Sequence, residues 1–280
     1  MRISIVGSNG QLGRDLIGQL SDHEVIPFSR SDFDVTDHNR ARSALSSAAP
    51  EMIVNLTAYH RVDDCEANVE LAYAVNVLAV LNLARVANDL NATIVQFSTD
   101  YVFGGETVTP YSEASPTFPL SIYGNSRLAG EFLVQTQAKR YFLIRTSGLY
   151  GKAGSQGKGG NFVEAMLRKA RNGESIRVVS DQIVTPTATL DLARQLAVIL
   201  TTSHYGLYHM TNEGSCSWYE FAKAIFELKD VPADLSPTSS EAYRTPARRP
   251  RYSVLENRRL KDLGLNRMLP WREALAEYLG

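Results

Sequence analysis

A glycine-rich turn behind the first apolar run constrains the fold of this chain more than any other feature. Ile3–Val6 has the composition of a buried strand, and the seven residues that follow read Gly-Ser-Asn-Gly-Gln-Leu-Gly. The first glycine permits a tight turn, the second removes a side chain from the path of a phosphate, and the third lets a helix pack closely on the strand. This spacing predicts a dinucleotide-binding turn. The expected cofactor contacts are Gly7, Asn9, Gly10, Gln11, Leu12 and Gly13.

The first half of the chain alternates short strands with helices. Strands are predicted at Ile3–Val6, Glu24–Phe28, Met52–Leu56, Thr93–Ser98 and Arg140–Arg145. Helices are predicted at 10–20, 39–48, 68–89 and 122–138. Such alternation favours a parallel sheet with right-handed crossovers and helices on both faces, and it places ligands at the carboxyl ends of the strands. The predicted fold class is therefore α/β, a Rossmann-type doubly wound parallel sheet.

The pattern loosens in the second half. A Gly/Lys-rich loop at Gly151–Gly160 and a Pro/Ser/Arg-rich stretch from Pro232 to Pro250 interrupt it. Helices are still predicted at 161–172, 187–201, 217–228 and 271–279. We therefore expect residues 1–150 to form the dinucleotide-binding domain. Residues 151–280 should form mainly a smaller C-terminal substrate-binding lobe, with parts of 180–210 returning to the sheet.

Composition and charge narrow the class of protein. The formal net charge is -1, with 44% hydrophobic and 21% charged residues, so neither a nucleic-acid nor a membrane surface is indicated. The apolar N-terminal run is too short for a signal peptide, and we expect no apolar stretch of the ~18 residues that a membrane span needs. A cytoplasmic location is predicted. Cys65 and Cys216 lie in no metal-ligand spacing, so no metal site is expected.

The end of the second strand carries the residues that choose between NADPH and NADH. A site for NADH normally places a carboxylate there for the adenosine ribose, but this sequence has Arg30. A guanidinium can meet a 2′-phosphate, so NADPH is the expected cofactor and NADH the alternative. Asp34 and Val35 suit the amino group and ring face of adenine. A helix N-cap by Thr36 or Asp37 is a competing explanation of this segment.

Small and polar residues follow the third strand, where a bound cofactor would cross the edge of the sheet. This position predicts further cofactor contacts, which are Leu56, Thr57, Ala58, Tyr59 and, later in the chain, Asn76.

A hydroxyl, a phenol and a cation form the candidate reacting group. Thr99 ends the fourth strand, and Tyr123 precedes Arg127 by four residues on a predicted helix. That spacing puts both side chains on one helix face, so the cation can lower the pKa of the phenol and make it a usable proton donor. Thr99 can hydrogen-bond the same substrate oxygen and polarise a carbonyl. Tyr123 and Arg127 are also expected to contact the cofactor.

Several motifs together carry a resemblance to a known family. They are GxxGQLG at 7–13, DVTD at 34–37, VDxxE at 62–66, STDYVF at 98–103, YGxxxLAGE at 123–131, RTSxLYG at 145–151, GGNF at 159–162, SDQxxTPT at 180–187 and RPxYSVL at 249–255. Across essentially its whole length the chain resembles the dTDP-4-dehydrorhamnose reductase branch of the extended short-chain dehydrogenases. The resemblance implies reduction of the C4 keto group of a dTDP-4-keto-6-deoxyhexose, which makes dTDP-L-rhamnose with a hydride from NADPH or NADH.

The resemblance also implies roles for single residues. Tyr123 would be the proton donor and Thr99 the hydroxyl that polarises the carbonyl. The substrate contacts implied are His60, Val62, Asp100 and Tyr101 around the sugar, and Arg249 at the nucleotide diphosphate. The expected partners are the nucleotide sugar and, as an open possibility, a second copy of the chain in a homodimer.

Two departures from the family pattern keep other functions open. The family carries lysine where this chain has Arg127, and an aromatic residue that packs on the sugar where this chain has Gly148. One alternative is a cofactor-binding regulatory protein, because the β subunit of methionine adenosyltransferase resembles these reductases. The other is a nucleotide-sugar reductase or epimerase with a different substrate.

Overall fold

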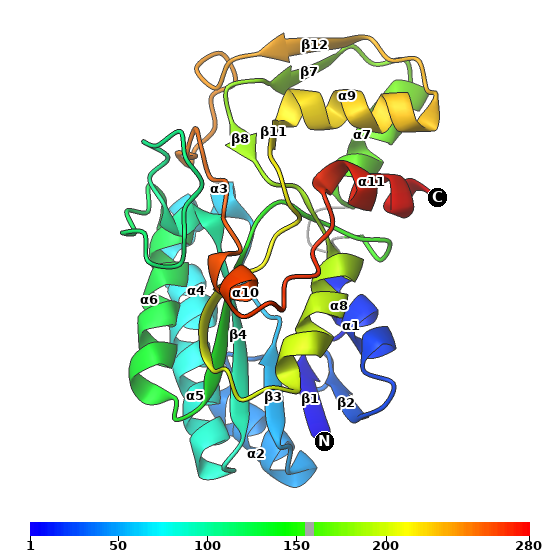
Figure 1. Ribbon diagram of the computed structural model, residues 1–280. Helices are drawn as coiled ribbons and strands as arrows, with labels where there is room; N and C mark the ends of the chain where they lie inside the picture. The colour runs from blue at the N-terminus through cyan, green and yellow to red at the C-terminus, as the bar shows by residue number, and fades with distance from the viewer. Residues whose placement is uncertain (155–159) are drawn as a thin grey trace.

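The computed structural model describes residues 1–154 and 160–280, and a parallel six-stranded sheet lies at its centre (Figure 1). In spatial order the strands are β2 (Glu24–Phe28), β1 (Arg2–Val6), β3 (Met52–Asn55), β4 (Thr93–Thr99), β5 (Tyr141–Thr146) and β10 (Gly206–His209). Every neighbouring pair is parallel. The chain moves outward from β1 to β2 and then returns to β3 on the other side, so the sheet changes direction between β1 and β3. The predicted doubly wound fold is confirmed, and a ligand crevice is expected at this switch point.

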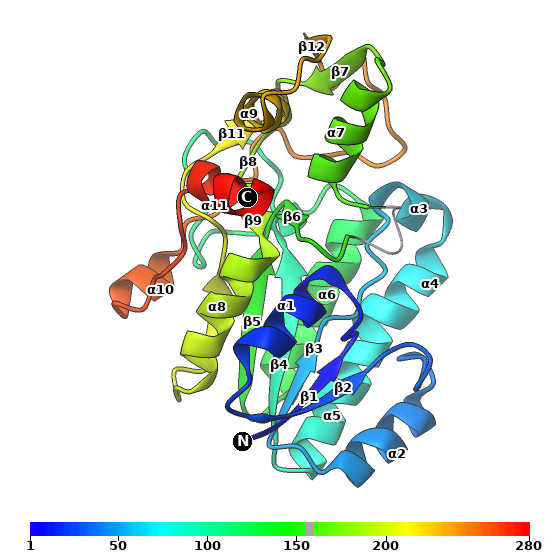
Figure 2. The same ribbon diagram turned by 90° about the vertical axis from the view of Figure 1, so that its right-hand side faces the viewer.

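Helices cover both faces of the sheet (Figure 2). One face carries α1 (Gln11–Gln19) and α8 (Thr189–Leu200), and the other carries α2 (His38–Ala48), α5 (Ala79–Asp89) and α6 (Ile122–Gln137). The first layer buries Leu16 and Leu196 against Ile5, whereas the second buries Leu45 and Leu83 beside Ile53. Because both faces are dry, the strands read as nearly continuous apolar runs in the sequence.

The helix predicted at 68–89 is interrupted. It consists of α4 (Val69–Tyr73), a π-helical turn, η1 (Ala74–Leu78), and α5, and it is preceded by α3 (Val62–Ala67). Among the described residues, Val69–Asp89 is the one helix long and apolar enough to cross a membrane, contrary to the expectation from sequence. Its buried residues Val80, Leu83 and Ala87 pack in the core beneath the sheet, which accounts for the apolar composition.

The remaining elements form the upper part of the molecule in Figure 1, apart from η2 (Asp100–Val102) after β4 and α10 (Arg258–Asp262) beside β10. They are β6 (Leu149–Tyr150), α7 (Phe162–Arg171), β7 (Ile176–Val179), β8 (Ile183–Val184), β9 (Thr187–Ala188), β11 (Cys216–Ser217), α9 (Trp218–Lys229), β12 (Leu235–Thr238) and α11 (Trp271–Leu279). Their two-residue and four-residue strands pair as β6 with β9, β7 with β12 and β8 with β11. We call this part the second lobe.

An aromatic cluster supplies the core of the second lobe. Phe221 of α9 lies at its centre and contacts the rings of Tyr150, Phe162, Trp218 and Trp271. Since α8 and β10 return to the main sheet, the chain passes between the sheet and the second lobe several times. The boundary proposed at residue 150 stays a prediction, and residues 155–159 of the loop predicted at 151–160, with the first glycine of the GGNF motif, lie outside the described residues.

Candidate functional site

The glycine turn between β1 and α1 has the shape of a phosphate cradle. Gly7 has a φ of 88°, which a side chain rarely tolerates, and a Cβ on Gly13 would lie 2.4 Å from the Ser8 carbonyl oxygen. Gly10 is the N-cap of α1 and supplies no side-chain hydrogen bond, so this residue leaves the positive end of the helix uncapped. Such an N-terminus suits the pyrophosphate of a dinucleotide.

Two predicted contacts in this turn point elsewhere. Leu12 is buried in the core. The Gln11 side chain accepts a hydrogen bond from the backbone N–H of Gly151 at 2.9 Å, which ties the turn to the beginning of the second lobe. For both residues, contact with a cofactor would have to come from the backbone. The exposed Asn9 has no such restriction.

At the adenosine end, Arg30 and Asp34 pair with each other. Arg30 Nη2 lies 2.9 Å from Asp34 Oδ2, and its side chain is 88% exposed. Hydrogen bonds from the backbone and side chain of Thr36 lower the pKa of Asp34, and the charge of Arg30 adds to this effect. Asp37 caps α2 by accepting from the Arg40 N–H, as one of the two explanations predicted. Val35 packs in the core, so its side chain is less available to adenine than expected.

A closed ring of buried polar contacts supports the loop after β3. The Asn55 side chain accepts from Thr57 and donates to Gln96 at 2.8 Å, and Gln96 donates to the Phe97 carbonyl at 2.8 Å. Arg127 Nη2 donates to the same carbonyl. Asn76 completes the ring, because it contacts both Arg127 and the backbone of Tyr59, which follows Asn55 by four residues in the chain. The ends of β3 and β4 and the helix α6 are thus fixed relative to one another. Satisfied polar networks of this kind rigidify their surroundings.

Asn76 is the member of the ring that reaches the loop backbone. Its Oδ1 accepts from the Tyr59 N–H at 2.9 Å and from Arg127 Nη1 at 3.5 Å, while its Nδ2 donates to the Tyr59 carbonyl at 3.1 Å and to Ser126 Oγ at 3.0 Å. The π-helical turn η1 carries Asn76, and π-turns often mark functional positions. Gly130 of α6 makes this approach possible, because a Cβ there would lie 2.4 Å from the Asn76 carbonyl oxygen.

Arg127 is buried without a carboxylate partner among the described residues. It is 4% exposed, and its Nε has no hydrogen-bond partner in the part of the chain that the structure describes. An unpaired buried cation is costly, so this nitrogen is a candidate contact for a bound ligand. The guanidinium thus binds neighbouring residues through two nitrogens, while Nε has no partner among the described residues.

The structure brings Thr99 and Tyr123 together at the carboxyl end of β4. Burial raises the pKa of the Tyr123 phenol above its ordinary value, and it outweighs the positive charge of Arg127 and a hydrogen bond with Thr99, which both act to lower this pKa. Arg127 therefore acts on the pKa of Tyr123 in the expected direction, but its effect is smaller than that of burial.

Asp100 lies behind Thr99 rather than at an open surface. It is 4% exposed and accepts from Thr99 Oγ1 at 3.0 Å and from Ser147 Oγ at 2.9 Å. Burial raises the pKa of its carboxyl to about 6. The contact of Asp100 with the sugar that the resemblance implies stays a prediction, and in the structure its carboxylate oxygens accept from Thr99 and Ser147.

Of the other expected substrate residues, Tyr101 is nearest to Tyr123. The two rings meet edge-on with centroids 5.9 Å apart and an angle of 78° between their planes. His60 and Val62 are half-buried. His60 precedes α3, with its Nδ1 3.2 Å from the Ala58 carbonyl oxygen, and Val62 is the first residue of α3. Arg249 arrives from the second lobe and forms a bidentate pair with Asp63. Its expected contact with a diphosphate stays a prediction.

Three carboxylates that hold the site in place were not among the predicted residues. Glu66 accepts from the Ile122 N–H at 2.9 Å and so caps α6 just before Tyr123. Glu131 forms a buried bidentate pair with Arg145, with Nη2 to Oε2 at 2.6 Å. Asp63 is the third. All lie in the VDxxE and LAGE motifs, so the sequence contained the signal but did not show which side chains pair.

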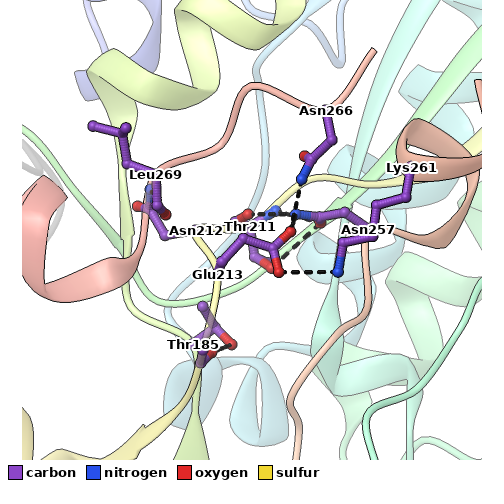
Figure 3. A network of polar contacts seen from close by, with 9 residues as sticks. Thr185, Thr211, Asn212, Glu213, Asn257, Lys261, Asn266 and Leu269 are labelled. Atoms are coloured by element: carbon purple, nitrogen blue, oxygen red, sulfur yellow. Dashed lines mark hydrogen bonds and ion pairs between the residues drawn. The ribbon is translucent and has the colours of Figure 1, made fainter. Parts of the chain in front are cut away.

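A polar network around Glu213 connects the second lobe to the sheet (Figure 3). Glu213 lies between β10 and β11, and its carboxylate accepts from Asn257 at 3.0 Å, Asn266 at 2.9 Å and Lys261 at 3.0 Å. Its backbone also pairs with Leu269 and the start of α11. The network gathers three passes of the chain at one point, so the second lobe is held over the carboxyl edge of the sheet.

Comparisons with known proteins identify relatives over the whole chain. The family model described as "RmlD substrate binding domain" matches residues 1–280. The chain is 41% identical to the spore coat polysaccharide biosynthesis protein SpsK of Bacillus subtilis (99% of this chain, 96% of that protein). It is 38% identical to a dTDP-4-dehydrorhamnose reductase of Streptomyces griseus (98% and 91%).

The fold also matches a solved relative. A crystal structure of dTDP-4-dehydrorhamnose reductase from Bacillus anthracis in complex with NADP is similar over 99% of this chain and 98% of that chain, with a TM-score of 0.95 and 38% identity. Its chain length, sheet and second lobe therefore correspond to those described above.

Proposed function

The chain belongs to the family of the RmlD substrate binding domain, and from this premise we propose that it reduces the C4 keto group of a dTDP-4-keto-6-deoxyhexose with NADPH or NADH. The reaction proposed is dTDP-4-dehydrorhamnose to dTDP-L-rhamnose. The observation that carries the proposal is the meeting of Thr99, Tyr123 and Arg127 at the carboxyl edge of β4, beside an open glycine turn.

The residues present fit a dinucleotide. The N-terminus of α1 is open for a pyrophosphate, and a Cβ on Gly7 would come within 3.2 Å of the loop at Leu56 and Thr57, so the turn and this loop already lie side by side. Arg127 Nε is a buried donor without a partner among the described residues. When bound, the reduced nicotinamide supplies a hydride to the carbonyl carbon. NADPH is the proposed choice because Arg30 lies at the adenosine end.

The protein's own residues deal with the oxygen of the carbonyl. Tyr123 gives its phenolic proton to the oxygen as the C–H bond forms, and the charge of Arg127 stabilises the resulting phenolate. Thr99 donates its one hydroxyl proton to Asp100 in the free protein and turns this proton to the carbonyl oxygen when the sugar binds, while it still accepts from the Tyr101 N–H. Asn76 binds both Arg127 of α6 and the backbone of Tyr59. These contacts keep the position of the proton donor fixed relative to the loop after β3.

Single-turnover reduction of dTDP-4-dehydrorhamnose, followed by NADPH absorbance, tests the proposal. Wild type should oxidise one NADPH per sugar, and Tyr123→Phe should lose most of the rate while NADPH affinity and melting temperature stay nearly the same. Cofactor binding without turnover of any dTDP-4-keto sugar would instead favour the regulatory protein. A Phe variant that reacts at the wild-type rate would show that Tyr123 is not the donor.

The family also indicates a partner and a location. A nucleotide sugar is the small molecule that members of the family bind, and a cytoplasmic location agrees with the synthesis of nucleotide sugars. We propose a homodimer only as a further step. The exposed apolar side chains Leu71, Leu78 and Phe132 on α4, η1 and α6 are the surface that light scattering on a Leu78→Glu variant would probe.

A further inference from the structure

The segment around Arg249 crosses from the second lobe onto the first domain, and Asp63 of α3 receives it. Asp63 Oδ1 accepts the backbone N–H of Ala247 at 3.2 Å. The two carboxylate oxygens also take Arg249 Nη1 at 3.1 Å and Nη2 at 2.7 Å. With side chains 20% and 36% exposed, the pair is largely shielded from water, and its two parallel hydrogen bonds fix the plane of the guanidinium.

The remaining hydrogen bonds of Arg249 within the second lobe lie on Nη1, and Nη2 keeps one N–H beyond its bond to Asp63. Nη1 donates to Thr245 Oγ1 and to the Ala247 carbonyl at 3.1 Å, both within the same loop of the second lobe. The guanidinium also lies beside the Tyr101 hydroxyl, where its charge and a side-chain hydrogen bond act on that phenol. Arg249 therefore connects one acidic side chain and one aromatic side chain of the first domain.

Tyr101 in turn lies against the proton donor. Its ring contacts the Tyr123 ring edge-on at 5.9 Å, and its backbone N–H donates to Thr99 Oγ1 at 3.2 Å. A Cβ on Gly124 would lie 2.3 Å from the Tyr101 carbonyl oxygen, so the first turn of α6 presses directly on this residue. A shift of Tyr101 would therefore move both Tyr123 and Thr99.

We propose that Asp63 and Arg249 are positioning residues that hold the Tyr101 ring as the wall of the sugar pocket beside Tyr123. Asp63 fixes the guanidinium, and the guanidinium fixes the Tyr101 hydroxyl. The proposal rests on the proposed function, because the wall matters when a keto sugar is presented to Tyr123. It gives Arg249 a role in orienting the sugar in place of the diphosphate contact that the resemblance implies. At Gly148, where the family carries an aromatic residue, no side chain shares this task.

Asp63→Asn tests the proposal, with Asp64→Asn as the matched control. Asp64 lies on the same helix and pairs with Arg61 at 2.9 Å near solvent. We expect Asp63→Asn to lower kcat for the keto sugar about tenfold and to weaken dTDP-L-rhamnose binding about tenfold, as one charge-assisted contact is weakened. Its Kd for dTDP, which lacks the sugar, should stay within about twofold of wild type. Asp64→Asn should change none of the three.

A double-mutant cycle separates this relay from a general loss of structure. Tyr101→Phe removes the hydroxyl that Arg249 holds, so Asp63→Asn should have little further effect on kcat in that background. Arg249→Lys keeps the charge but loses the two-pronged contact and should repeat the pattern of Asp63→Asn. Asp63→Glu should recover part of the kcat. Melting temperatures of all variants identify any that fail to fold.

Three results would overturn the relay. Additive effects of Asp63→Asn and Tyr101→Phe would remove the link between them. A large loss of dTDP affinity in Arg249→Lys would place the guanidinium on the diphosphate. An equal effect of Asp64→Asn would reduce the observation to surface charge. Failure of the proposed function is recognised separately. In that case wild type shows no turnover of the keto sugar, and the affinity of the variants for dTDP-L-rhamnose still tests the relay. If wild type does not bind dTDP-L-rhamnose either, both proposals are wrong.

Discussion

The two ends of the dinucleotide groove are built in opposite ways. At the proposed catalytic end, Arg127 and Arg145 are each 4% exposed and are held by one carbonyl oxygen, one amide and one carboxylate. At the adenosine end, Arg30 is 88% exposed and pairs with Asp34 across the surface. The same residue type therefore works in a dry, fully constrained setting at one end and in a wet, screened setting at the other.

The difference indicates how each end meets its ligand. Electrostatic contacts in a low-dielectric interior are strong and costly to rearrange, so the catalytic end is organised before a ligand arrives. A surface pair is worth at most about 1 kcal/mol and is screened by salt. A 2′-phosphate can therefore replace Asp34 as the partner of Arg30 at little cost. Fixed geometry serves chemistry, and an exchangeable pair serves recognition.

The largest expected effect concerns the buried pair that holds α6 to β5. Glu131→Gln leaves the Arg145 charge buried without a carboxylate, which should lower the free energy of unfolding by about 3–5 kcal/mol. Asp34→Asn at the adenosine end should lower it by less than about 1 kcal/mol. Urea unfolding of both variants measures the contrast. Similar losses would mean that burial does not distinguish the two ends.

The next effect concerns the hydroxyl at the reacting centre. Thr99→Val keeps the shape of the side chain but removes its hydrogen bonds, so kcat should fall about 10²-fold, as for one lost oxyanion donor. The Kd for NADPH should stay within about twofold, because the role proposed for Thr99 is at the sugar oxygen. Stopped-flow reduction and a cofactor titration give the two values. A fall in kcat below about threefold would remove Thr99 from the mechanism.

The two ends should also respond to pH with opposite signs. Burial raises the pKa of Asp100 from 3.8 to about 6, so the stability this group contributes is present below 3.8 and lost as pH rises to about 6. Relative to Asp100→Asn, wild type should lose about 2 kcal/mol over that interval. Hydrogen bonds lower the pKa of Asp34, so its contribution is present at neutral pH and lost on acidification. Unfolding measured against pH for both Asn variants tests the signs; equal slopes would contradict them.

The smallest effect concerns the choice of cofactor. Arg30→Ala should weaken NADPH binding by about 1 kcal/mol, since an exposed charge-assisted contact with the 2′-phosphate is screened by water. NADH, which lacks this phosphate, should bind as before. Titrations at low and high salt provide the measurement, and the difference between the cofactors should shrink as salt rises. Equal curves for the two cofactors before and after the substitution would contradict the role of Arg30.

Much of the frame could be predicted because it depends on local periodicity. β2 has the predicted bounds, and α6 and α11 begin or end within a residue of theirs. The elements that were not predicted are short or irregular. α3 and α10 span six and five residues, and η1 interrupts a helix whose apolar pattern is continuous. Such elements depend on contacts from distant parts of the chain, which a local pattern does not contain.

The candidate site divides in the same way. Local spacing was sufficient to predict Gly7, Gly13, Thr99 and Tyr123. A tight turn, a close approach of helix and strand, a strand end and a helix face each require particular residue types at fixed separations. The burial of Asp100 and Val35 could not be recognised from the sequence. Both residues follow predicted strands, where an exposed position is expected, but neighbouring segments cover them. Arg249 was recognised as a guanidinium near the site, but its partner Asp63 is 186 residues away in sequence.

By itself the sequence determined the parallel sheet and the glycine turn, and it supplied the proposal for the reacting side chains, because these follow from periodicity and from motifs that act over a few residues. Only the tertiary structure decided which charges are paired and which are left over. The partners of Arg127, Arg145 and Arg249 come from other strands and helices. Pairing energies depend on burial and on distances between such segments, and neither is written in the order of the residues.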